Sequence, residues 1–166
     1  MSDDAFDVGA PEPGVPITAI PATIAILATA VAIPAAVLAL LGAGLMIVGV
    51  RRGNRRLHTM GAAASFAGVL FATALGAAPA LALLGGACAV LAWDAGEHAI
   101  GLGQQVGRDA DARRAVLVHT GASSLAAIGI VLLTTVVYLL ARTGQPSTAA
   151  GVLVAAVGLF ALLLHR

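Results

Sequence analysis

Apolar residues form long runs along the chain, separated by a few short polar stretches. Residues 17–50 contain no ionisable side chain, and residues 57–93 contain only one, His58. Two further apolar runs cover residues 115–141 and 148–164. Such runs predict helices that cross a lipid bilayer, because about 20 consecutive apolar residues span its hydrocarbon core.

The first run is too long for one crossing. A single helix over residues 17–50 would measure about 51 Å, whereas the hydrocarbon core is about 30 Å thick. Pro34 suits the first turn of a second helix, where its missing N–H costs no hydrogen bond. We therefore predict two crossings with a turn near residues 32–35. The alternative is one long tilted helix, which lowers the total number of crossings from six to five.

The remaining runs complete the predicted fold. Residues 57–93 predict a helical hairpin, since Gly-Ala-Ala-Pro at positions 76–79 is a turn signal. Residues 115–141 predict one long helix, and residues 148–164 predict the returning crossing. The expected fold is an all-α membrane protein, a six-transmembrane helical bundle of three hairpins over residues 17–166. A disordered acidic tail is expected over residues 1–16, which hold four carboxylates and no basic residue.

Composition excludes several other classes of protein. The chain is 60% hydrophobic and 10% charged, so it cannot form an ordinary water-facing surface. Its one cysteine, Cys88, cannot form an internal disulfide. Too little polar chain remains for a basic domain that binds nucleic acid, and no nucleic-acid partner is expected.

The arginines predict the orientation in the membrane. There is no lysine, and eight of the nine basic residues fall on one side of the predicted bundle, with only Arg142 opposite. Because basic residues concentrate in cytoplasmic loops, this side and the C-terminus are expected in the cytoplasm of a multi-pass cell-membrane protein. The arginines expected to contact partner proteins or anionic lipids are Arg51, Arg52, Arg55, Arg56, Arg108, Arg113 and Arg114.

Aromatic and small residues refine this picture. Trp93 and Tyr138 fall at the predicted inner and outer interfaces, where amphipathic rings anchor a helix. Small residues allow the close backbone approach that holds helices together in lipid. The same chemistry also serves a homo-oligomer contact, and sequence does not separate the two. The small residues in the predicted helices include the glycines Gly42, Gly44, Gly49, Gly61, Gly68, Gly85, Gly86, Gly121 and Gly129.

Ionisable residues gather just after Trp93. If the helix continues, its period brings Asp94, Glu97 and His98 onto one face, with His119 or His58 as neighbours. One hypothesis is a divalent-cation site made by Asp94, Glu97, His98 and His119. The favoured interpretation is that the carboxylates pair with arginines and join the helix ends. Ser123 is expected to bond a backbone carbonyl one turn back, and no cofactor or enzymatic activity is predicted.

The same region carries a family resemblance. It reads Trp-Asp-Ala-Gly-Glu at 93–97, Ile-Gly-Leu-Gly at 100–103 and Gly-Arg-Asp-Ala-Asp-Ala-Arg-Arg at 107–114. This run resembles an uncharacterised family of small haloarchaeal integral membrane proteins. This chain departs from the family's pattern at two positions, where it has His98 and Gln104 in place of the expected asparagine and glutamate. Proteins of that family can be encoded near a MoxR-type ATPase, so the resemblance implies a membrane subunit of a larger assembly.

These observations favour a non-enzymatic membrane scaffold or partner subunit. Its arginine-rich loops would bind proteins or membrane lipids. A small channel or transporter is the alternative, although the predicted membrane cores lack the Asp, Glu and Arg residues that such proteins keep at depth.

Overall fold

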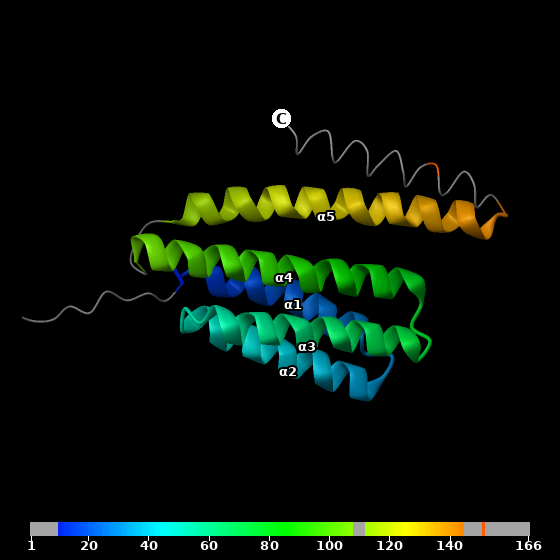
Figure 1. Cartoon of the computed structure of the whole chain (residues 1–166), viewed down its shortest axis with the longest axis horizontal. Coiled ribbons are helices and arrows are strands. Elements are labelled where there is room, and N and C mark those ends of the chain that lie inside the picture. The colour runs from blue at the N-terminus through cyan, green and yellow to red at the C-terminus, as the bar shows by residue number, and fades with distance from the viewer. Residues whose placement is uncertain (1–9, 108–111, 145–150, 152–166) are drawn as a thin grey trace, which may run out of the picture. The chain divides into compact units, whose positions relative to one another are not determined.

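The computed structural model describes residues 10–107, 112–144 and 151, and this part of the chain is helical without strands. The predicted all-α fold is therefore confirmed. The helices, shown in Figure 1, are α1 (Gly14–Ala28), α2 (Ile33–Arg51), α3 (Arg55–Ala74), α4 (Pro79–Val106) and α5 (Arg113–Arg142).

Four helices, α2 to α5, are long and apolar enough to cross a membrane. Helix α1 is also apolar, but its 15 residues extend only about 22 Å, less than the hydrocarbon core. The predicted sixth segment, residues 148–164, lies outside the described residues apart from Gly151. Six crossings are therefore not supported, and the coarser prediction of a helical membrane protein stands.

The first apolar run is divided into two helices, as predicted. Helix α1 ends at Ala28 and α2 begins at Ile33, so the turn covers residues 29–32, slightly earlier than the predicted 32–35, and Pro34 lies in the first turn of α2. The alternative of one continuous helix is therefore wrong. The first helix also starts earlier than the predicted boundary at residue 17. The segment before this helix contacts the end of α2, because the amide of Ala10 donates to the carbonyl of Val50 at 3.4 Å.

The hairpin over residues 57–93 is confirmed. Helix α3 ends at Ala74 and α4 begins at Pro79, with Gly76 at a φ of 93° in the turn between them. Because a side chain is disfavoured at positive φ, glycine suits this position. Helix α4 then continues well past Trp93 to Val106, which places the ionisable residues on a helix.

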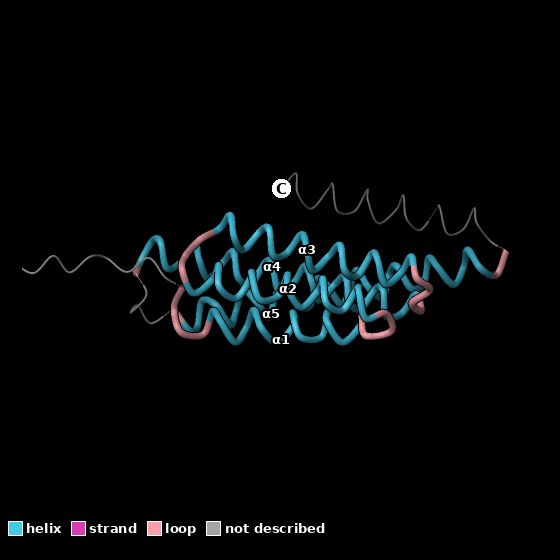
Figure 2. The backbone as a smooth tube through the Cα atoms, turned by 90° about the horizontal axis from the view of Figure 1, so that it is seen from below, coloured by secondary structure: helices cyan, strands magenta, loops and turns pink. Residues whose placement is uncertain are grey.

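The chain divides into two compact units, Met1–Ala127 and Ile128–Arg166. In the first unit, α2 packs against α3 and α1 against α4, and the α3–α4 and α1–α2 contacts close the bundle. Figure 2 shows the described helices and the short loops between them. The first part of α5, up to Ala127, belongs to this unit. In the second unit, the described residues continue α5 from Ile128 to Arg142 and end in a turn.

Glycines bring the backbones of α2 and α3 into direct contact. A Cβ atom added to Gly49 would lie 2.6 Å from the amide nitrogen of His58, and one added to Gly68 would lie 2.9 Å from the carbonyl oxygen of Ala35. Gly42 and Gly61 are equally confined by the facing helix. By contrast, Gly44, Gly121 and Gly129 face open space among the described residues. The prediction of close packing over small residues thus holds for the α2–α3 pair.

Candidate functional site at the arginine-bearing end

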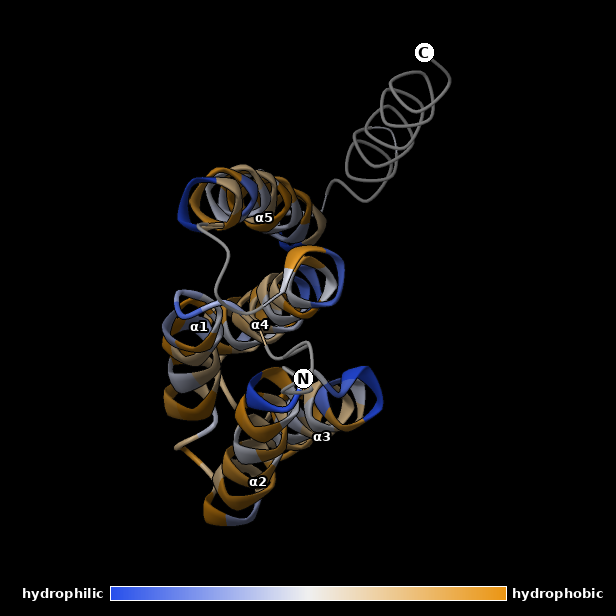
Figure 3. Cartoon of the chain, turned by 90° about the vertical axis from the view of Figure 1, so that its left-hand side faces the viewer, coloured by the Kyte–Doolittle hydropathy of each residue, from blue (hydrophilic) through white to orange (hydrophobic). Residues whose placement is uncertain are grey.

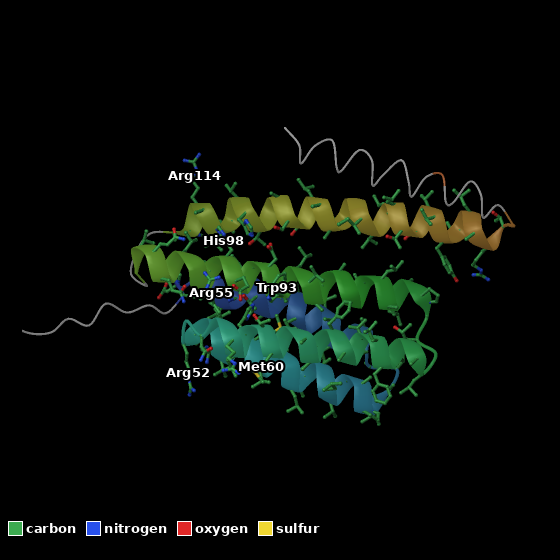
Figure 4. The ribbon with its side chains drawn as sticks, viewed as in Figure 1. Arg52, Arg55, Met60, Trp93, His98 and Arg114 are labelled. Atoms are coloured by element: carbon green, nitrogen blue, oxygen red, sulfur yellow. The ribbon has the colours of Figure 1, made fainter. Side chains whose placement is uncertain are left out.

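Arginines from three helices gather at one end of the first unit. Arg51 and Arg52 end α2, and Arg55 and Arg56 begin α3. Arg113 and Arg114 begin α5 at the same end, which Figure 3 shows end-on and Figure 4 from the side. All six residues are exposed. Arg108 lies outside the described residues.

A hydrogen-bonded network joins α4 to the α2–α3 turn. The guanidinium of Arg55 donates to Glu97 Oε2 at 2.7 Å and to Gln104 Oε1 at 3.2 Å. Thr59 donates to the other oxygen of Glu97 at 3.3 Å, and Gln104 donates to the carbonyl of Gly53 at 3.3 Å. Glu97 therefore pairs with an arginine and joins α4 to α3, as the favoured interpretation of the sequence predicts.

Asp94 faces α5 instead. Its Oδ2 atom accepts a hydrogen bond from Ser123 Oγ at 2.6 Å and lies 2.9 Å from His119 Nε2. The expected bond from Ser123 to its own backbone is thus wrong, because the carboxylate is the stronger acceptor. The ring of His119 also stacks on that of His98, with centroids 3.8 Å apart and 11° between the planes. Side chains, rather than backbone contact, join the start of α5 to α4.

His58 does not belong to this cluster. Its ring is completely buried, with Nδ1 3.2 Å from the carbonyl oxygen of Met46 and Nε2 3.0 Å from that of Trp93. The ring lies against Gly96, where an added Cβ would overlap it. His58 therefore links α2, α3 and α4. Sequence reasoning missed the role of Gly96, although a glycine inside a long helix is itself a signal of close packing.

A polar cavity of about 390 Å³ lies beside these groups. Among the described residues, His98 Nε2 is buried without a hydrogen-bond partner. The described residues contain no group of three or more His, Cys, Asp or Glu side chains that could hold a metal ion. Of the four candidate ligands, His119 contacts Asp94 and His98 in separate pairs, whereas Glu97 bonds to α3. The cavity is lined by Arg55, Asp94, Glu97, His98, Gln105 and His119, with Gly101 and Leu102.

The two predicted aromatic anchors lie on different helices. Trp93 is 41% exposed on α4, one turn before Glu97. Tyr138 is 37% exposed near the far end of α5, where the Arg142 guanidinium lies 5.6 Å from its ring centroid. Both side chains are accessible to a bilayer interface, and their anchoring role stays a prediction.

Comparison with known proteins gives one family. No match was found among curated proteins or solved structures. The family match covers residues 10–162, and with it the whole α4–α5 junction. The chain therefore belongs to DUF7519, a family of unknown function.

Proposed function

We propose that this protein is a non-enzymatic subunit embedded in the cell membrane, which binds a partner protein or anionic lipids through its arginine-bearing end. The observation that carries this proposal is the convergence of exposed arginines from three separate helices. Aligned cations of this kind attract an acidic surface much better than scattered ones, and they act over about a Debye length.

The exposed arginines project from a rigid part of the bundle, which favours a binding role over a catalytic one. The glycine contacts between α2 and α3, the buried ring of His58 and the Arg55–Glu97 pair all restrain this end of the bundle. A preorganised surface loses little conformational entropy when a partner binds. A scaffold needs such a surface.

The proposed orientation places the arginine-bearing end in the cytoplasm. Positive residues are retained on the cytoplasmic side of membrane proteins, so the binding surface would meet soluble proteins and anionic headgroups there. The resemblance to haloarchaeal membrane proteins suggests an ATPase of the MoxR type as one partner. A second copy of the chain is another, because the exposed apolar faces allow self-association.

A second candidate function, a small channel or transporter, is favoured by the Asp94 cluster. Asp94, His98 and His119 are ionisable residues on helices apolar enough to cross a membrane, and such groups often mark the path of an ion. Asp94 lies about three turns from the end of α4, however, and its carboxylate is bonded to Ser123 and His119 on α5. These bonds between the two helices support an interhelical joint better than a conducting path.

Site-specific photocrosslinking in native membranes tests the proposal. A crosslinker at Asn54, in the α2–α3 turn, should capture a discrete partner protein or lipid. The adduct should be lost when Arg51, Arg52 and Arg56 are changed to glutamate, but retained in Arg142→Glu at the other end of α5. Equal crosslinking from Ala78 in the α3–α4 turn, or adducts unaffected by charge reversal, would contradict it. Ion or solute flux through liposomes containing only this chain would favour the channel instead.

A further inference from the structure

An apolar groove runs along the outside of the α3–α4 pair, below the arginine-bearing end. Its volume is about 250 Å³. Ala62, Ala63 and Phe66 form the α3 wall, and Ala89, Val90 and Trp93 form the α4 wall. The groove is open to the outside, since Phe66 is 42% exposed and Trp93 41% exposed. Thr59 lies at the upper end of the groove, and its hydroxyl already donates a hydrogen bond to Glu97.

Small residues between two aromatic rings create this groove. The three alanines leave space that larger side chains would fill, while the rings of Phe66 and Trp93 stand at its two ends. Phe66 lies over Gly86, where an added Cβ would be 3.7 Å from the ring. Gly86 and Trp93 are two helical turns apart, which gives a groove about 10 Å long. The apolar lining of this slot suits a hydrocarbon chain.

A cation stands above the groove. Arg56 lies three and seven residues before Thr59 and Ala63, so all three share one face of α3. Its neighbour Arg55 is neutralised by Glu97 at 2.7 Å. Arg56 is exposed and makes no ion pair within the described part of the chain. An apolar slot below an exposed cation that pairs with no carboxylate of the described residues matches the two halves of an anionic lipid.

We propose that this groove binds one acyl chain of an anionic phospholipid, whose phosphate is held by Arg56. The inference rests on the proposed function, because it assigns the lipid contact of the arginine-bearing end to one residue and one groove. A zwitterionic lipid could fill the slot equally well, but it would gain less from the cation. One arginine near a membrane surface contributes about 1 kcal/mol, which corresponds to about a fivefold preference for the anionic lipid.

Trp93 supplies the readout, because it is the only tryptophan in the chain. The full-length protein is placed in phosphatidylcholine vesicles that contain a minor fraction of lipid with brominated acyl chains, which quench tryptophan on contact. Brominated phosphatidylglycerol should quench Trp93 as strongly as about a fivefold larger fraction of brominated phosphatidylcholine. Arg56→Gln should abolish this difference, whereas Arg114→Gln on α5 removes the same charge and should preserve it.

A groove-filling variant separates the chain site from the headgroup site. Ala63→Phe should lower quenching by both lipids, and circular dichroism checks that the helices remain. Equal quenching of the unaltered protein by both lipids, or a preference that survives Arg56→Gln, would overturn the inference. Protection of Trp93 from both lipids in a dimeric sample would assign the groove to a second copy and overturn it as well. Crosslinking of a partner protein at Asn54 is read independently, so failure of the lipid site leaves the proposed function standing.

Discussion

The imidazole of His58 lies 3.0 Å from the carbonyl oxygen of Trp93, in a space that exists only because the next turn of α4 carries Gly96. The same ring contacts the carbonyl of Met46 on α2. The two ring nitrogens of one α3 side chain thus face backbone carbonyls of both neighbouring helices, and a neutral imidazole donates to one of them. In lipid, where apolar burial gives little net gain between helices, such polar contacts and close packing supply the stability.

Gly96→Ala should destabilise the bundle. The new methyl group would overlap the His58 ring, which is confined on its other sides, and overpacking of this kind costs about 1–3 kcal/mol. Thermal unfolding in detergent, followed by circular dichroism, measures the effect. Gly121→Ala is the matched control, because its Cβ meets no atom within 4 Å among the described residues. Equal stability of the two variants would show that His58 is not confined as described.

Asp94→Ala should loosen the start of α5. It removes the acceptor of both Ser123 and His119, and each interhelical hydrogen bond in a membrane is worth about 0.6 kcal/mol, or about threefold in local opening. Hydrogen–deuterium exchange over residues 113–127 should therefore become faster. Ser123→Ala should give a smaller increase, since it removes one bond only.

Thr120→Val is the control for the same helix. The Thr120 hydroxyl is buried without a hydrogen-bond partner among the described residues, so its replacement by a methyl group should be neutral or slightly stabilising. Faster exchange in Thr120→Val than in Ser123→Ala would contradict the assignment of the α4–α5 joint to Asp94.

The Arg55–Glu97 pair should contribute modestly and in a salt-dependent way. The Arg55 side chain is 49% exposed and that of Glu97 is 21% exposed, so solvent screens the 2.7 Å contact. A double-mutant cycle with Arg55→Ala and Glu97→Ala should give a coupling energy below about 1 kcal/mol, smaller at high salt. A coupling of several kcal/mol, independent of salt, would mean that this end is dehydrated.

The sequence predicts the helices well because their signals are local. Unbroken apolar runs, Pro34 and the Gly-Ala-Ala-Pro turn each act within a few residues, and the structure confirms the helices that they predict within residues 17–141. The number of crossings is harder to predict from the sequence, because α1 is apolar enough to enter a membrane but too short to span it. Apolar composition shows that a segment tolerates lipid, whereas spanning also depends on helix length.

The candidate site is only partly predictable. Helical period predicts that Asp94, Glu97 and His98 share a face, with His119 or His58 as a neighbour, and the structure brings Asp94 and His98 to His119. Glu97 lies beside them in sequence, yet its side chain turns to Arg55 on α3. Which neighbour each carboxylate meets depends on how α3 and α5 are placed around α4, and local pattern does not encode that placement. The partner of Ser123 was missed for the same reason.

Labelling of single cysteines tests most directly the claim that the arginine-bearing end lies in the cytoplasm. With Cys88→Ala as background, one cysteine replaces Asn54 in the α2–α3 turn and another replaces Ala78 in the α3–α4 turn. A maleimide that cannot cross membranes should label position 78 in intact cells and position 54 only in inverted vesicles. Labelling of position 54 in intact cells would contradict the proposed orientation and remove the cytoplasmic binding surface.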